Sequence, residues 1–242
     1  MNKNNGVTMV EKKAGWPDLF RRLWEFIGLR LLLGLTTAII GLFFFGWLTD
    51  EVLEGETAKF DNAVRLFVHE SASPVVTELM RFATFLGSTW FLIALGLGIA
   101  VIFYLVGWRR ALILFVTTMA GAIILNFALK TVVHRARPEP YFETPLPSSF
   151  SFPSGHALFS VCFYGALAWL LTARIRNRTG QIGIWAFSVL LIFLIGLSRV
   201  YLGVHYPSDV IAGYAAASIW VFAIAFGDSM LKKRSPSKKI ND

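Results

Sequence analysis

The sequence is poor in cysteine and in charged residues. Cys162 is the only cysteine among 242 residues, which excludes an intrachain disulfide, and its place in an apolar run indicates a packing role. Charged residues make up 16% of the chain, against about 25% in a typical soluble protein. The 23 basic residues flank apolar segments instead of clustering on a polar face, so the positive net charge does not indicate a nucleic-acid partner.

Long apolar runs dominate what remains. Hydrophobic residues make up 55% of the chain and the mean hydropathy is +0.60, values typical of an integral membrane protein. A span needs about 17 to 25 apolar residues, and six runs approach that length. We therefore predict an all-α fold, an integral membrane six-helix bundle, with spans near residues 28–48, 90–106, 111–129, 157–173, 182–197 and 210–227.

The distribution of basic residues predicts the orientation of this bundle. Placing both termini in the cytoplasm puts most of the 23 basic residues on the cytoplasmic side, as membrane proteins prefer. The first run is too long for a cleavable signal peptide and no small-residue cleavage site precedes "TDEVLEGE", so we expect it to be retained. The predicted location is the inner (cytoplasmic) membrane. The predicted parts are a cytoplasmic segment 1–27, a six-span domain 28–227 and a basic cytoplasmic tail 228–242.

The first extracytoplasmic loop, about residues 50–89, contains apolar residues at helical spacing. Two groups, divided by Pro74, predict two amphipathic helices. These helices either lie on the outer leaflet, where they would line a lateral entrance for a lipid, or cap the bundle. His69 has no carboxylate or cysteine at ligand spacing, so we expect it to be solvated. The two apolar groups are Phe60, Ala63, Val64, Phe67, Val68 and Val75, Val76, Leu79, Met80, Ala83.

Three polar stretches fall at helix ends on the predicted extracytoplasmic side, in loops 130–156 and 198–209. They are "KTVVHRARP", "PSGH" and "SRVYLGVHYPSD". Lys130, Arg137 and Arg199 supply positive charges suited to phosphate oxygens. Ser154 and the backbone N–H groups near Gly155 start a helix, where an anion is favoured. The stretches together therefore predict a phosphate-binding site.

Two histidines add chemistry to this site. Asp209 follows His205 by four residues, so its carboxylate is expected to orient the imidazole and leave the second ring nitrogen free to attack phosphorus. His156 is then available to protonate the leaving oxygen and later to activate water. Two alternatives are a metal site built from His156, His205 and Asp209, which the three nearby cations disfavour, and simple polar residues at the membrane interface.

These motifs together resemble those of the type 2 phosphatidic acid phosphatase superfamily, over about residues 111–226. The resemblance implies a metal-independent enzyme without a cofactor, with His205 as nucleophile, Asp209 as its partner and His156 as acid and base. It also implies that phosphate is bound by Lys130, Arg137, Ser154, Gly155, Arg199 and Ser198. The matching patterns are K-x6-R-P (Lys130, Arg137, Pro138), P-S-G-H (Pro153 to His156) and S-R-x5-H-x3-D (Ser198, Arg199, His205, Asp209).

Positions beside the motifs receive weaker predictions. His134 and Arg135 fall at variable positions of K-x6-R-P, and we interpret them as interfacial or substrate-flanking at most. Asn126, one turn before Lys130, is expected to hydrogen-bond to another helix. The superfamily includes soluble haloperoxidases that hold vanadate, a role that six spans argue against.

The sequence therefore predicts a phosphatase of membrane lipids acting on the outer face. Candidate substrates are undecaprenyl diphosphate, which we favour, phosphatidylglycerol phosphate, phosphatidic acid and lipid A. The expected partners are this lipid phosphate and the bilayer, with no nucleic acid and no obligate protein partner. A lipid phosphotransferase using the same phosphohistidine is one alternative. A six-span anion transporter is another, although the spans carry few charges near their middle.

Overall fold

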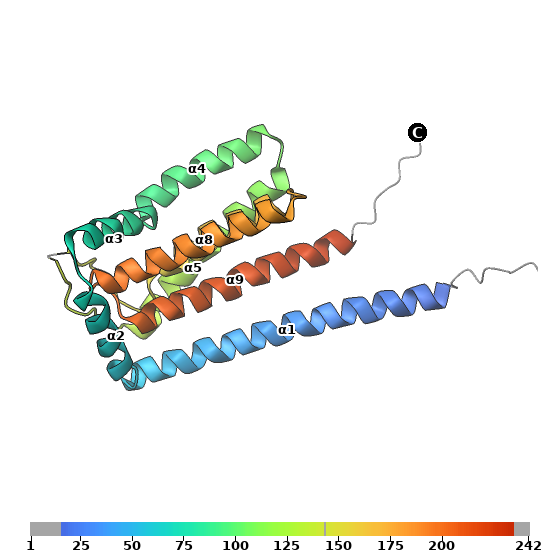
Figure 1. The fold of residues 1–242 in the computed structure, drawn as a ribbon. Helices are drawn as coiled ribbons and strands as arrows, with labels where there is room; N and C mark the ends of the chain where they lie inside the picture. Colours follow the sequence, from blue (N-terminus) through green and yellow to red (C-terminus); the bar gives the residue numbers. More distant parts are fainter. Residues whose placement is uncertain (1–15, 143, 235–242) are drawn as a thin grey trace, which may run out of the picture. The chain divides into compact units, whose positions relative to one another are not determined.

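A computed structural model describes residues 16–142 and 144–234, and within these ranges the chain is all-α, as predicted (Figure 1). Of the described residues, those from Ile40 onward form one compact unit and those up to Ile39 form a second; the site and the packing described below belong to the first. The helices are α1 (Trp16–Glu54), α2 (Ala58–Glu70), α3 (Pro74–Leu86), α4 (Thr89–Leu105), α5 (Arg109–Val133), α6 (Gly155–Ser160), the π-helical turn η1 (Val161–Gly165), α7 (Ala166–Thr172), α8 (Arg178–Tyr201) and α9 (Pro207–Arg234).

The six predicted apolar runs coincide with helices, except that the runs 90–106 and 157–173 each extend one residue past the helix end. Among the described residues, five helices are long and apolar enough to cross a membrane. A sixth span results if α3 and α4 are counted together, since they pass the same test as a pair bent by 50°. Ser88 lies at this bend and its Oγ accepts the Phe91 N–H at 3.4 Å, which starts α4. The five single helices are Gly34–Glu54, Arg109–Val133, Gly155–Thr172, Arg178–Tyr201 and Pro207–Leu231.

The continuous helix from α6 through η1 to α7 is the central element of the bundle. It is 61% buried, whereas the other four single spans are at most 28% buried. Five consecutive residues, from Cys162 to Ala166, are buried, which an ordinary amphipathic helix with one covered face would not allow. Because "PSGH" lies at the start of this helix, its residues are brought to the middle of the bundle.

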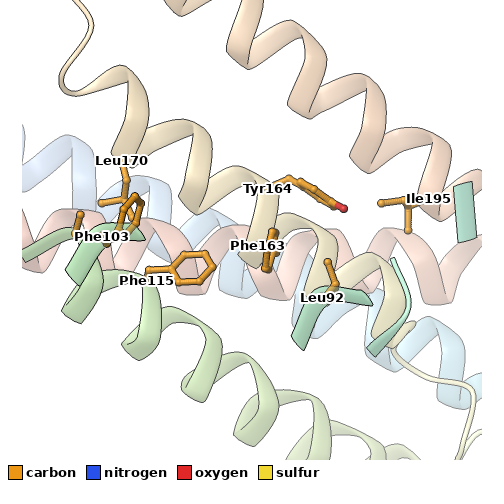
Figure 2. Close-up of a cluster of buried hydrophobic side chains, with 8 residues drawn as sticks. Leu92, Phe103, Phe115, Phe163, Tyr164, Leu170 and Ile195 are labelled. Atoms are coloured by element: carbon orange, nitrogen blue, oxygen red, sulfur yellow. The ribbon is translucent and has the colours of Figure 1, made fainter. Parts of the chain in front are cut away.

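Aromatic side chains fill the space between this central helix and its neighbours (Figure 2). Phe115 of α5 lies edge-on to Phe163 of η1, with ring centroids 5.3 Å apart, and edge-on to Phe103 of α4 at 6.2 Å. The Tyr164 hydroxyl donates to the Leu86 carbonyl at 2.8 Å. In a hydrocarbon environment such close packing and hydrogen bonding, not removal of apolar surface from water, holds helices together.

Helices α2 and α3 follow the division at Pro74 that the sequence predicts, and both pack on the bundle. Val64 and Val68 of α2 pack against the cluster of Ala157, Val200 and Val210, and α3 contacts α8. In Figure 1, α2 crosses the end of the bundle at which α8 ends and α9 begins. Other apolar residues of these helices are exposed, among them Phe60, Phe67, Val75 and Leu79. Their placement at a membrane surface stays a prediction.

Candidate active site

The three polar stretches meet at one end of the bundle. The Ser154 N–H, at the start of α6, donates to the Asp209 carbonyl of α9 at 3.0 Å. Nη1 of Arg137, in the segment after α5, lies 3.0 Å from Nε2 of His205. The Ser151 N–H donates to the Arg135 carbonyl at 2.8 Å. Segments far apart in the sequence therefore form a single polar cluster.

A tight turn between α8 and α9 places His205. Gly203 has a φ of +76°, and a Cβ there would lie 2.6 Å from the Tyr141 nitrogen, so both the backbone conformation and the close approach require glycine. Pro207 starts α9, where its missing N–H costs nothing. His205 lies between these residues and is 2% exposed. The turn thus fixes the imidazole inside the protein.

The hydrogen bonds of His205 define which ring nitrogen carries the proton. Nε2 faces Arg137, and because a guanidinium only donates, Nε2 must be the accepting nitrogen. Nδ1 therefore carries the hydrogen, and it lies 3.3 Å from Oδ2 of Asp209 and 3.3 Å from Oγ of Ser151. Burial lowers the pKa of His205 to about 4, more than Asp209 raises it. At neutral pH the ring is neutral, with its lone pair on Nε2.

Asp209 is buried and fully hydrogen-bonded. Its Oδ2 accepts from the Ser151 hydroxyl at 2.5 Å and from the Tyr206 N–H at 3.0 Å, in addition to facing His205. Its Oδ1 accepts from Nη1 of Arg135 at 2.6 Å. A carboxylate that is satisfied on both oxygens stays ionised in the protein interior.

The predicted phosphate-binding cations gather without carboxylate partners. Arg137 donates to the carbonyl oxygens of Ser149 at 2.8 Å and Val204 at 2.9 Å, and Lys130 donates to the Phe150 carbonyl. Arg199 donates to the Thr84 hydroxyl. Within the described part of the chain, none of the three cations has a carboxylate within 4.0 Å. The cluster therefore has positive charge available for an anion.

Two buried polar atoms in the cluster have no hydrogen-bond partner among the residues that the structure describes. They are Nε of Arg199 and Oγ of Ser154. Leaving such a group unsatisfied costs about 1–3 kcal/mol, and such groups call for an explanation in a native protein. A bound phosphate, which offers several acceptor oxygens, would satisfy both. A Cβ at the neighbouring Gly155 would lie 3.3 Å from Oδ1 of Asn126, so a side chain there would crowd the start of α6.

The remaining predicted site residues differ in their surroundings. His156, the second residue of α6, hydrogen-bonds to none of the residues that the structure describes, and its nearest charged neighbours include Arg199 and Arg137. The Ser198 hydroxyl donates to the Ile195 carbonyl of its own helix at 2.6 Å. A role for Ser198 in phosphate binding stays a prediction.

Arg135 has more contacts than its sequence position indicates. It was predicted to be interfacial or substrate-flanking at most, but its side chain is 15% exposed and contacts Asp209. Its Nη2 donates to Oδ2 of Asp61 at 2.8 Å, and its guanidinium lies 4.1 Å from the centre of the Tyr206 ring. Burial lowers the pKa of Arg135, but Asp209 and Asp61 outweigh this effect and raise it.

Asp61 was also missed, although its position carries a signal. It precedes Val64 and Val68 by three and seven residues, so it lies on the face of α2 that packs against the bundle. An acidic residue on such a face is expected to have a buried partner. Asp61 is 0% exposed.

Two further predictions are wrong. His69 is half-buried instead of fully solvated, because its ring stacks on Tyr141 with centroids 3.9 Å apart and its Nδ1 is buried. Asn126 does not hydrogen-bond to another helix among the described residues, since its Oδ1 is buried without a partner beside Gly155. His134 ends α5 with a φ of 50° and lies edge-on to Phe150 at 4.5 Å.

The fold and this cluster define a multi-pass helical protein with a group of cationic side chains at one end of its bundle. Comparison with known proteins gives the family. The family model described as PAP2 superfamily matches residues 111–230. Phosphatidylglycerophosphatase B of Bacillus subtilis (strain 168) is 32% identical over 163 residues, which cover 66% of this chain and 79% of that protein. The chain therefore belongs to the PAP2 superfamily.

Other similar proteins agree with this assignment. An undecaprenyl-diphosphatase of Sulfolobus acidocaldarius is 35% identical over 137 residues, covering 54% of this chain and 60% of that protein. The crystal structure of a transmembrane PAP2-type phosphatidylglycerolphosphate phosphatase from Bacillus subtilis superposes with a TM-score of 0.72 and 26% identity. That superposition covers 84% of this chain and 98% of the other.

Proposed function

We propose that this protein is a membrane lipid phosphatase that hydrolyses phosphate or diphosphate headgroups through a phosphohistidine at His205. The observation that carries the proposal is the arrangement around this ring, with the Nε2 lone pair facing the cations and Nδ1–H facing Asp209. A neutral imidazole held in this tautomer is ready to attack phosphorus.

In the first step, Nε2 of His205 attacks phosphorus and the bond from phosphorus to the lipid oxygen breaks. Asp209 stabilises the positive charge that forms on the imidazole. Lys130, Arg137 and Arg199, together with Ser154 and the backbone at Gly155, hold the three non-bridging oxygens. His156 protonates the departing oxygen. Its lack of a hydrogen bond to the described residues leaves both ring nitrogens available for that exchange.

In the second step, His156 accepts a proton from water, the water oxygen attacks phosphorus, and the bond to Nε2 breaks. Inorganic phosphate leaves and His205 returns to its neutral form. The alternative metal site is not favoured, because His156, His205 and Asp209 do not form a metal-binding group in the described ranges and three cations surround them.

The substrate and the side of action are inferred from the relatives and the charge pattern. Relatives are named phosphatidylglycerophosphatase B, undecaprenyl-diphosphatase and, in Rhizobium johnstonii, lipid A 1-phosphatase. These names share a lipid phosphate, and undecaprenyl diphosphate remains our preferred substrate. The basic residues of the termini favour an extracytoplasmic site in the inner membrane. Several of them, Lys3, Lys12, Lys13, Lys238 and Lys239, lie outside the described residues.

Purified protein in nanodiscs, assayed for phosphate release from a panel of lipid phosphates in EDTA, tests the proposal. We expect release by the wild type and a loss of at least ~10³-fold in His205→Ala, as for removal of a nucleophile. Quenching with alkaline SDS, in which a phosphohistidine survives, should trap ³²P label from the substrate on the wild type only.

His134→Asn is the matched control. It replaces a neighbouring histidine with a residue that tolerates a positive φ, and it should retain activity. Metal-dependent release, or labelling and turnover in His205→Ala, would contradict the mechanism.

A further inference from the structure

A buried bridge of three charged side chains connects α2 to the site. Arg135 lies between two carboxylates, with Nη1 2.6 Å from Oδ1 of Asp209 and Nη2 2.8 Å from Oδ2 of Asp61. Both carboxylates are 0% exposed. Asp61 belongs to α2, Arg135 to the segment after α5, and Asp209 to α9. The two arms of one guanidinium thus join two helices, a geometry that the single ammonium of lysine cannot reproduce.

Asp61 also holds the start of α9. Its Oδ1 accepts the Ser208 N–H at 2.9 Å, and its Oδ2 accepts the Ser208 hydroxyl at 2.7 Å. The first N–H groups of a helix have no partner within the helix and attract negative charge. Asp61, from a different helix, therefore caps the N-terminus of α9. The residue that it binds, Ser208, immediately precedes Asp209.

Arg135 also fixes how the Asp209 carboxylate is turned. Oδ1 is held by Arg135, while Oδ2 receives Ser151, Tyr206 N–H and His205. Without the guanidinium, Oδ1 would lose its partner and the carboxylate could rotate away from the imidazole. Building on the proposed function, we infer that Arg135 and Asp61 are positioning residues of the reaction, which hold and partly neutralise Asp209.

If the bridge positions Asp209, its charges should also affect the proton affinity of His205. A purely stabilising role would not predict this effect. Removing the Arg135 charge leaves Asp209 uncompensated, which favours a proton on His205. Removing the Asp61 charge lets Arg135 compensate Asp209 more fully, which disfavours that proton. The two substitutions should therefore not move the His205 titration in the same direction.

The other charged and titratable groups near this pair are the same in both variants and in the wild type. They are Arg137 and Arg199 beside His205, His156 across the site, Lys130 near Asp209, and Arg65 of α2 over the Tyr206 ring.

The test is an NMR titration of ¹⁵N-histidine-labelled protein in detergent micelles, with the His205 signal assigned by its loss in His205→Ala. From a wild-type pKa of about 4, Arg135→Gln should raise the midpoint, and Asp61→Asn should leave it at or below the wild-type value. This readout needs no turnover. A wild type that releases no phosphate would therefore contradict the proposed function while the bridge is still tested.

Activity supplies the second readout. We expect Arg135→Gln to lower kcat about 10- to 100-fold, the usual cost of losing a group that orients a reacting residue, with little change in KM. Arg135→Lys keeps the charge but not the fork, so it should lower kcat while leaving the His205 midpoint near wild type. Circular dichroism of each variant verifies folding.

Arg65→Gln is the matched control. Arg65 fastens α2 by donating to the Glu139 carbonyl at 2.8 Å and lying over Tyr141, without contacting Asp209. It should leave both the midpoint and kcat unchanged. If Arg135→Gln and Asp61→Asn only lower the melting temperature and leave the midpoint and kcat alone, or if both raise the midpoint, the inference is wrong.

Discussion

The two ends of the α5–α9 pair carry the same ion pair in different settings. At one end, Nε of Arg110, the second residue of α5, lies 2.7 Å from Oδ1 of Asp228 near the end of α9. At the other end, Arg135, just after α5, lies 2.6 Å from Oδ1 of Asp209 in the first turn of α9. Each end of this antiparallel pair is thus closed by an arginine on the α5 side and an aspartate on the α9 side.

The two ends differ in the exposure of the arginine and in the number of carboxylates that this arginine contacts. The Arg110 side chain is 48% exposed, and its Nη2 also donates to the Asp228 carbonyl at 3.0 Å. The Arg135 side chain is 15% exposed and shared with a second carboxylate, Asp61. Asp228 itself is only 4% exposed, so its pair with Arg110 is half-buried. Solvent-exposed pairs contribute about 0–1 kcal/mol and breaking a buried pair costs about 3–5 kcal/mol, so we expect the Arg110 end to fall between these limits and the Arg135 end to lie at the upper one. An arginine–aspartate pair therefore joins α5 to α9 at one end, whereas at the other end we infer that it positions the Asp209 carboxylate.

The largest expected contrast is between Asp209→Asn and Asp228→Asn. The first removes the charge that holds the Nδ1–H tautomer of His205, and we expect kcat to fall about 10³- to 10⁴-fold. The second should leave kcat unchanged and lower the melting temperature by a few degrees. Phosphate release and thermal melts of both proteins measure this. Comparable losses of kcat would show that the two ends are not functionally distinct.

Mild acid should destabilise the folded protein by protonating His205. A histidine whose folded pKa is about 4, below its ordinary 6.5, binds its proton later in the folded state than in the unfolded state. Stability should therefore fall as pH drops from about 6.5 towards 4, by roughly 3 kcal/mol over that window.

Thermal melts followed by circular dichroism between pH 4 and 7 measure this loss. His205→Gln, which cannot titrate, is the control and should flatten the dependence in this range. An equal slope in both proteins would assign the acid sensitivity to other groups.

A smaller effect is expected from the serines beside the two aspartates. Ser151 donates to Oδ2 of Asp209 at 2.5 Å, so Ser151→Ala should lower kcat about 10-fold, because a hydrogen bond to a charged group contributes about 1.5–3 kcal/mol. Ser229 neighbours Asp228 but donates to the Phe226 carbonyl. Ser229→Ala should leave kcat unchanged. Steady-state kinetics at neutral pH compare the two, and a neutral Ser151→Ala would mean that Asp209 is held without this hydroxyl.

The sequence predicted those parts of the site whose residues lie close together in the chain. His205 and Asp209 are four residues apart, and Ser154 to His156 begin a helix, so spacing alone placed them. Asp61 and Arg135 lie 74 residues apart, and only the docking of α2 brings them together. An acid on the apolar face of α2 indicated a buried partner but not which one. The position of Arg135 inside K-x6-R-P gave no sign of its two carboxylates.

The π-helical turn η1 affects how segments can be exchanged between this protein and its relatives. A π turn holds one residue more than the α-helical turn it replaces, so it is the structural trace of a single-residue insertion. Each α-helical residue turns the chain by about 100°, and the extra residue at Val161–Gly165 separates the rotational register of α7 from that of α6. Exchanging the chain beyond Gly165 with that of a relative can therefore change how α7 packs on its neighbours, while the "PSGH" segment at the start of α6 keeps its orientation towards the site.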